Sequence, residues 1–236
     1  MKISGIAAVF GALLAGYASN AVGDQRLFTR VYEYSTLPRG HAELEHYLTF
    51  SAPSGGFKGQ AETEHQVEFE MGMNDRFDVG IYQVFVQGPG TGLVYEEMKV
   101  RGRYRFAEKG EHLVDTLVYL EGVNSSDFST QEIEAKLVLA HDFGPVAVSV
   151  NPVLEMAKTD GWESEPGYAA GLSWRALSLL SVGVEAFGGE DAHYAGPVIA
   201  HGNENFWVSL GLVMRHTGTD EHGPKTAVRM LSGWSF

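Results

Sequence analysis

The 236-residue sequence contains no cysteine. This absence excludes a disulfide scaffold, a zinc site built on thiolates, an iron–sulfur cluster and a cysteine nucleophile. Any metal site would have to use the nine histidines and the carboxylates.

Basic residues are scarce as well, with 17 Lys+Arg against 30 Asp+Glu and a formal net charge of -13. A chain of this charge repels phosphate backbones, so we expect no nucleic-acid partner. Hydrophobic residues nevertheless make up 44% of the chain, which is enough to build a folded domain.

Long apolar runs are missing except at the N-terminus, where residues 3–17 follow Lys2. This run is shorter than the ~20 residues that a membrane-spanning helix needs. The small residues Ser19 and Ala21 stand at the positions that a signal peptidase reads. We therefore expect a signal peptide over residues 1–21, cleaved after Ala21. The exported chain would be either soluble or a membrane barrel, whose strands never form long apolar runs.

From His41 onward the apolar residues recur at every second position, in segments of about ten residues. The clearest segment alternates Val94, Met98, Val100, Tyr104 and Phe106 with a basic series, Lys99, Arg101, Arg103 and Arg105. Side chains of a strand point alternately to its two faces, so each segment is a strand with one apolar and one polar face. Twelve such strands can be counted between residue 40 and the last residue.

The links between these strands alternate in character. Longer links rich in Gly, Ser and Pro lie near 54–56, 88–90, 124–126, 160–162, 188–189 and 217–219. Tighter links are expected at 74–75, 108–110, 142–144, 175–177 and 202–204. Outer-membrane barrels have short periplasmic turns and longer extracellular loops. The sequence therefore predicts an all-β fold over 40–236, a closed antiparallel transmembrane β-barrel with both termini in the periplasm.

The end of the chain carries a further signal, with Val228, Met230, Trp234 and Phe236 on one face and Ser232 as a departure from the apolar pattern. Together with the signal peptide and the strand pattern, it resembles small, porin-like outer-membrane β-barrel proteins of Gram-negative bacteria, from a poorly characterised group. The acidic hairpin over 67–82 resembles that group too. The resemblance implies an outer-membrane location, contact with outer-membrane lipids and lipopolysaccharide, and recognition of the terminal strand by the barrel assembly machinery.

In such a barrel the charged face of each strand points into the lumen. The predicted pore-lining residues are Glu43, Glu45, Glu68, Glu70, Lys99, Arg101, Arg103, Arg105, Glu132 and Glu134. They predict passive passage of small hydrophilic solutes or ions between walls of opposite charge. The alternative is that these charges pair and fill the lumen, since eight strands leave no channel, sixteen do, and twelve fall between. A non-conducting structural or adhesion barrel that acts through its external loops then remains open.

Later strands carry glycine at inward positions, at Gly171, Gly183, Gly211 and Gly233. These glycines would make one wall of the lumen thin. The space beside that wall could be an off-centre passage, or room for a periplasmic or plug-like segment formed by residues 22–39. The sequence does not decide between these two interpretations.

No residue set stands out as a catalytic or metal site. His46 and His65 share the lipid-facing side of neighbouring strands, with Ser51 and Thr63 on the same face, but no serine lies in a recognisable motif. A lipid hydrolase is therefore the least favoured alternative, and we predict no enzyme, cofactor or metal. The loop residues His216, Asp220, Glu221 and His222 offer ligand atoms without the spacing of a known metal site.

Overall fold

The computed structural model of the protein describes residues 25–158, 161–203, 205–219 and 223–236. The signal peptide predicted over residues 1–21 lies outside these ranges. Within them the chain forms twelve strands, and no helix long and apolar enough to cross a membrane occurs. The strands are β1 (Ala42–Ala52), β2 (Glu62–Asn74), β3 (Phe77–Gln87), β4 (Val94–Arg105), β5 (Asp115–Ser125), β6 (Gln131–Phe143), β7 (Val146–Lys158), β8 (Trp162–Leu177), β9 (Leu180–Gly188), β10 (His193–Gly202), β11 (Phe206–Thr217) and β12 (Thr226–Ser235).

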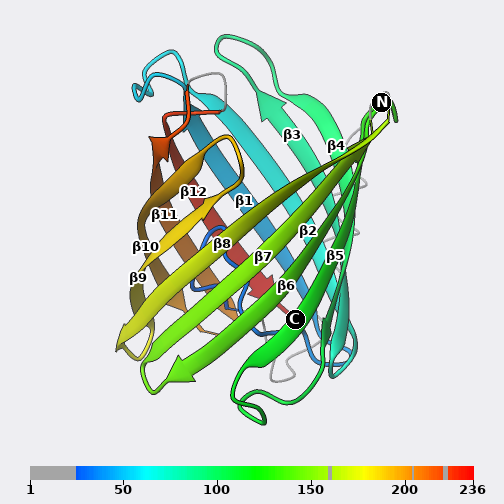
Figure 1. Ribbon diagram of the computed structural model, residues 1–236, viewed down its shortest axis with the longest axis vertical. Helices are drawn as coiled ribbons and strands as arrows, with labels where there is room; N and C mark the ends of the chain where they lie inside the picture. Colours follow the sequence, from blue (N-terminus) through cyan, green and yellow to red (C-terminus); the bar gives the residue numbers. More distant parts are fainter. Residues whose placement is uncertain (1–24, 159–160, 204, 220–222) are drawn as a thin grey trace, which may run out of the picture.

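Each strand pairs antiparallel with its neighbours in sequence, and β1 pairs with β12 to close the barrel (Figure 1). The closing register runs from Glu43 opposite Ser235 to Ala52 opposite Thr226. Closure leaves the sheet without an edge, so no row of backbone donors and acceptors is left unpaired. The predicted closed antiparallel barrel of twelve strands is confirmed.

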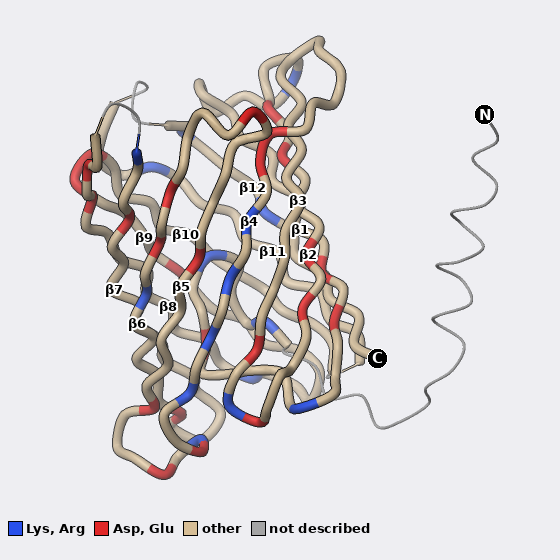
Figure 2. The backbone as a smooth tube through the Cα atoms, turned by 90° about the vertical axis from the view of Figure 1, so that its right-hand side faces the viewer, with Lys and Arg blue, Asp and Glu red and all other residues tan. Residues whose placement is uncertain are grey.

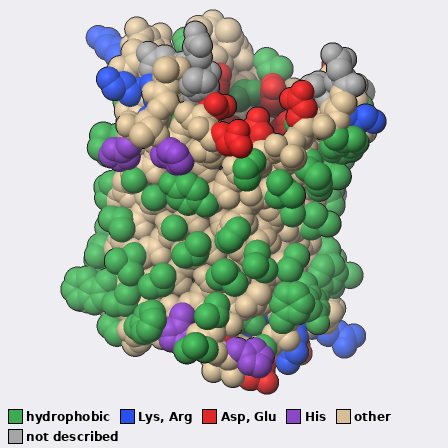
Figure 3. Space-filling view, in the orientation of Figure 1, with side chains coloured by type: hydrophobic (Ala, Val, Ile, Leu, Met, Phe, Trp, Pro, Cys, Tyr) green, Lys and Arg blue, Asp and Glu red, His purple; other side chains and the backbone are tan. Residues whose placement is uncertain are grey.

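The outer face of the barrel is apolar. Leu44, Phe69 and Trp174 expose 43%, 44% and 52% of their surface, whereas the inward Glu43, Glu68 and Asp78 expose none. Hydrophobic side chains cover the barrel wall in Figure 3, and charged ones gather towards its two ends. A protein in water would arrange these faces the other way round, so the pattern is that of a barrel whose wall faces lipid.

The links between strands lie at two ends of the barrel, which we call the loop end and the turn end. The loop end has the links 53–61, 88–93, 126–130, 159–161, 189–192 and 218–225. The turn end has the links 75–76, 106–114, 144–145, 178–179 and 203–205, and the C-terminus follows β12 there (Figure 1). The loop end corresponds to the predicted extracellular side.

One predicted tight link is longer than expected, and another was placed wrongly. The link expected at 108–110 spans 106–114, where the carboxylate of Asp115 accepts a hydrogen bond of 2.7 Å from the backbone of Gly110. Residues 175–177 belong to β8, and Leu177 pairs with Leu180 around the two-residue turn 178–179. Neither turn contains the Asn-Gly or Asp-Gly pair that marks a tight hairpin in a sequence.

The weakest strand in the sequence, interrupted by Gly196 and Pro197, is β10. Both residues pair with β9, whereas the register with β11 passes from Ala195 to Val198. Proline has no backbone N–H to donate to the second neighbour, so the ladder is interrupted on one side only.

Residues 25–41 belong to no strand and precede β1. Figure 1 shows this segment, in dark blue, inside the ring of strands. Phe28, Val31 and Leu37 have no exposed surface. We call residues 25–38 the inner segment.

Candidate functional site in the lumen

A cluster of ion pairs fills the lumen beside β2, β3 and β4 towards the turn end. We name it the ion-pair cluster, and its members are Glu68, Glu70, Asp78, Arg101 and Arg103. Arg101 donates to Glu68 at 2.7 Å and to Asp78 at 2.9 Å, and it also binds Glu70. Arg103 binds Glu70 and donates twice to Asp78, at 3.0 and 2.8 Å. All five side chains expose 1% or less of their surface, so this part of the basic series is packed rather than open.

Other predicted pore-lining residues extend this packed layer. Glu43 accepts hydrogen bonds from the indole of Trp207, at 3.0 Å, and from the hydroxyl of Ser235. Glu45 accepts a hydrogen bond from the hydroxyl of Tyr47. Because the carboxylates of Glu45, Glu68 and Glu70 converge, they could hold a cation, but the guanidinium of Arg101 already binds the latter two. The positive charge here is therefore the protein's own.

Figure 2 shows the basic positions of β4 following one another along the strand, with acidic positions on the strands beside it. The four basic residues have different surroundings. Arg101 and Arg103 are buried, Arg105 donates to the Thr36 hydroxyl of the inner segment at 2.7 Å, and Lys99 reaches the open cavity described below.

Residues 29–32 of the inner segment are held by side chains of the wall opposite the ion-pair cluster, whereas the backbone N–H of Leu37 donates to Asp78 of the cluster at 2.9 Å. Both Thr29 and Arg30 donate their backbone N–H to Glu185 at 2.9 Å. The backbone N–H of Tyr32 donates to Asn151 at 2.7 Å, and the carbonyl of Tyr32 accepts from Ser149 at 2.6 Å. These contacts satisfy backbone groups that no strand of the barrel pairs.

Two of the four inward glycines make room for this segment. A Cβ atom added at Gly171 would lie 2.6 Å from the ring of Phe28, and one added at Gly211 would lie 2.6 Å from the hydroxyl of Thr29. Real Cβ atoms do not approach other atoms so closely. The prediction of one thin wall is therefore only partly right: a Cβ at Gly183 would meet the backbone of Leu172, and one at Gly233 would meet the ring of Trp207.

A cavity of about 500 Å³ lies between the inner segment and the loop end of the barrel. Three of the predicted pore-lining residues, Lys99, Glu132 and Glu134, line it. The other seven do not. The cavity is also lined by charged residues that were not among the predicted set, namely Arg26, Arg30, Glu64, Glu121, Lys136, Glu155, Glu165 and Arg229.

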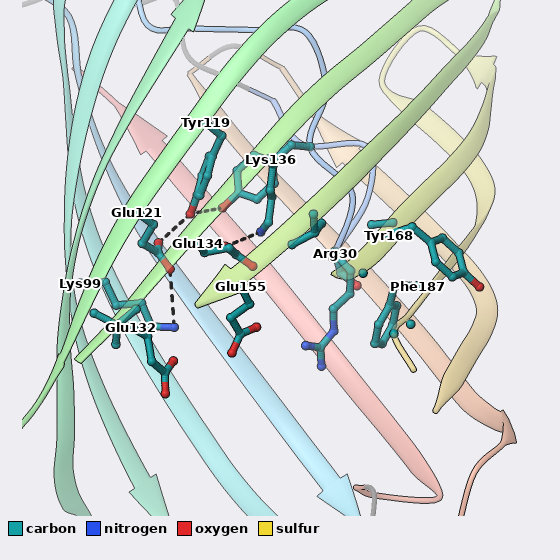
Figure 4. Close-up of a pocket in the computed structure, with 18 of the residues that line it drawn as sticks. Arg30, Lys99, Tyr119, Glu121, Glu132, Glu134, Lys136, Glu155, Tyr168 and Phe187 are labelled. Carbon is teal, nitrogen blue, oxygen red and sulfur yellow. Dashed lines mark hydrogen bonds and ion pairs between the residues drawn. The ribbon is translucent and has the colours of Figure 1, made fainter. Parts of the chain in front are cut away.

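One side of the cavity is acidic. Glu121, Glu134, Glu155 and Glu165 stand directly opposite one another across β5, β6, β7 and β8, and we call them the acidic row. Lysines reach only its first two members. The Lys136 amine lies 2.8 Å from Glu134, and the Lys99 amine lies 3.9 Å from Glu121 (Figure 4).

The other side of the cavity is basic. Arg30 of the inner segment stacks on the ring of Phe187 at 5.0 Å, and Arg229 of β12 stacks on Tyr47 at 5.2 Å. We call them the arginine pair. The Nε atom of each is buried without a hydrogen-bond partner. Burial and the nearby charge of Arg229 lower the pKa of Arg30 to about 10, which leaves it charged at neutral pH.

A second cavity of about 70 Å³ lies on the other side of the inner segment, towards the turn end. Leu27, Phe28, Glu33 and Tyr34 line this smaller cavity, whereas Arg26, Thr29, Arg30 and Tyr32 line the larger one. The inner segment therefore separates the two spaces.

On the outer face, the two histidines considered for catalysis lie side by side. His46 and His65 are hydrogen-bonded to each other, with Nε2 and Nδ1 3.2 Å apart. Among the described residues, no serine or threonine hydroxyl is hydrogen-bonded to either ring, so the nucleophile that a hydrolase requires is not positioned there. Of the proposed loop ligands, Asp220, Glu221 and His222 lie outside the described residues.

The fold is that of porin-like barrels. No protein-family model matches the chain, and no curated protein sequence does either. Among solved structures, the KdgM porin in complex with disordered oligogalacturonate aligns over 83% of this chain and 99% of its own, with a TM-score of 0.60 and 8% identity. The NanC porin aligns over 83% and 98% (TM-score 0.57, 8% identity). An outer membrane channel from Pseudomonas putida F1 aligns over 86% and 98% (TM-score 0.61, 11% identity). The chain thus shares the twelve-stranded architecture of these outer-membrane channels.

Proposed function

We propose that this protein resides in the bacterial outer membrane and allows passive passage of small hydrophilic solutes or ions through its charged lumen. The observation that carries the proposal is the cavity of about 500 Å³, which is lined by charges of both signs inside a closed barrel. A barrel that serves only as a scaffold has no need of charged side chains held without ion-pair partners in its interior. The fold similarity to porins supports the same function.

The passage proposed here runs from the loop end through the larger cavity, past the inner segment, and along β7 and β8 to the smaller cavity. Residues of β7 and β8 line both cavities, and the inner segment lies between them. In this proposal the inner segment narrows the passage, and the ion-pair cluster fixes its opposite side. Within the basic series, Lys99 then sets ion preference from the cavity, and Arg101 and Arg103 act through the packing of the cluster.

Planar-bilayer recording tests this function. We expect unitary currents from the folded protein, and the reversal potential in a salt gradient should move towards anion preference in the variant Glu132→Gln/Glu155→Gln. The variant Glu163→Gln removes the same kind of charge from β8 outside the cavity and should leave the reversal potential unchanged. Absence of unitary current would overturn passage and favour a structural or adhesion barrel that acts through its external loops.

Membrane assembly is part of the same proposal. Trp234 of β12 is 54% exposed on the outer face, and the ring of Phe236 packs 6.4 Å from that of Phe69. We propose that Val228, Met230, Trp234 and Phe236 form the signal read by the barrel assembly machinery, and that the apolar wall contacts outer-membrane lipids and lipopolysaccharide. Replacing Phe236 with serine should reduce the amount of folded, membrane-inserted barrel, measured by its heat-modifiable gel migration.

A further inference from the structure

Several charged side chains on the two sides of the larger cavity form no ion pair within the described residues. Glu155 and Glu165 of the acidic row form no ion pair or hydrogen bond with a described residue, and neither does the neighbouring Glu132. Like charges placed directly opposite one another across antiparallel strands repel. A cationic group inside the cavity would relieve this repulsion.

The arginine pair in turn has hydrogen-bond donors that no described residue accepts. Arg30 and Arg229 make no ion pair within the described chain, and their buried Nε atoms have no acceptor. Guanidinium groups bind carboxylates through two parallel hydrogen bonds. The aromatic rings of Phe187 and Tyr47 hold the two guanidinium planes from one side and leave N–H groups for such an acceptor.

Both sets of charges face one space. In Figure 4, Arg30 and Glu155 both point into the cavity from different sides, and Glu132 lies farther along the acidic side. A simple cation would leave the arginine pair without an acceptor, and a simple anion would be repelled by the acidic row. A molecule that carries a carboxylate at one end and an ammonium group at the other satisfies both sides at once.

We propose that the larger cavity binds a small zwitterion, such as an amino acid or a short peptide. Its carboxylate would bind Arg30 and Arg229, and its ammonium group would bind Glu132 and Glu155. This proposal names the class of solute that the proposed passage would carry. It rests on the proposed function only for how the solute reaches the cavity.

Triglycine and its two end-blocked forms test the proposal, because they differ in charge and hardly in size. Isothermal titration of the folded, detergent-solubilised protein should show triglycine binding at least tenfold more tightly than N-acetyltriglycine, which lacks the ammonium group. Triglycinamide, which lacks the carboxylate, should be weaker by a similar factor. Equal binding of triglycine and either blocked form would overturn the zwitterion site, as would no binding of triglycine.

Variants of the cavity residues test which side chains bind each end of triglycine. The double variant Arg30→Gln/Arg229→Gln should reduce triglycine binding to the level of triglycinamide, and Glu132→Gln/Glu155→Gln should reduce it to the level of N-acetyltriglycine. Arg39→Gln and Glu163→Gln remove like charges outside the cavity and should bind as the unmodified protein does. If either double variant keeps full affinity while gel migration shows a folded barrel, the assignment is wrong.

Titration and bilayer current separate this proposal from the proposed function. Triglycine binding without unitary current would overturn passage and leave the zwitterion site standing. Current without triglycine binding would overturn the zwitterion site and leave passage standing.

Discussion

The two sides of the lumen are filled in different ways. Beside β2, β3 and β4, the strands fill the interior with their own side chains, and five charged groups are tied together by short ion pairs. Beside β7 to β11, the inward positions are small, and the inner segment occupies the space. The first filling is part of the barrel wall, whereas the second is a separate stretch of chain held by hydrogen bonds and by buried side chains such as Phe28, Val31 and Tyr32.

This difference indicates which side of the lumen can change without unfolding the barrel. Removing an ion-pair partner leaves a buried charge in the wall itself. Releasing the inner segment exposes polar groups such as Glu185, Asn151 and Ser149, which water can then hydrate. We therefore expect changes on the two sides to affect different measurements.

The largest effect is expected from Arg101→Met combined with Arg103→Met. The double variant leaves the carboxylates of Glu68, Glu70 and Asp78 buried without a cation, at a cost of about 3–5 kcal/mol for each broken pair. Urea unfolding of the protein in lipid vesicles should show this loss. The exposed Arg39→Met is the matched control. A loss below about 1 kcal/mol would mean that the cluster does not hold the wall together.

A smaller and more local effect is expected from Phe28→Ala. Its ring is fully buried against Gly171, so the change should weaken docking of the inner segment by about 3–5 kcal/mol. Limited proteolysis should cut within residues 25–38 more rapidly, while the urea midpoint of the barrel stays the same. The control is Phe57→Ala, in an exposed loop. If the urea midpoint of the barrel falls as well, the inner segment is an integral part of the wall.

Two glycine variants compare the sides directly. Alanine at Gly171 would meet the ring of Phe28, and alanine at Gly80 would meet Glu68 and Arg101 of the ion-pair cluster. Overpacking of this kind costs about 1–3 kcal/mol. Gly80→Ala should lower the stability of the barrel to urea, whereas Gly171→Ala should raise protease sensitivity of the inner segment alone. The reverse assignment of these effects would contradict the comparison.

The smallest effect is expected from Glu185→Gln. This change removes the charge that accepts hydrogen bonds from the backbone of Thr29 and Arg30 and from the hydroxyl of Thr29. Docking should weaken by about 1–2 kcal/mol, because an amide oxygen still accepts some of these bonds. Hydrogen exchange at the two amides should accelerate about tenfold. Unchanged exchange would show that other contacts hold this part of the segment.

The barrel could be predicted from the sequence because alternation of apolar and charged residues sets which face of each strand meets lipid. The same alternation placed Glu68, Glu70, Arg101 and Arg103 inside. It gave no register across the barrel, so it could not tell that these four would pair into a closed cluster while Lys99 stayed in the cavity.

The arginine pair was missed for two reasons. Arg229 lies on the inward face of β12, and the alternation around Val228 and Met230 could have marked it as a lumen residue. Arg30 gave no such signal, because the inner segment follows neither a strand nor a helix period. Its position depends on contacts with Glu185 and Phe187, which are distant in the sequence.

The central claim is that the inner segment narrows the passage through the lumen, and a disulfide between Thr29→Cys and Gly211→Cys tests it most directly. The chain contains no cysteine, and a Cβ at Gly211 would contact the side chain of Thr29, so a disulfide between these two positions would tie the inner segment to β11. Single-channel recording would compare the oxidised and reduced forms, with each single-cysteine variant as a control. We predict a smaller unitary current while the bond holds the segment in place than after reduction. Equal currents in both forms would contradict the account.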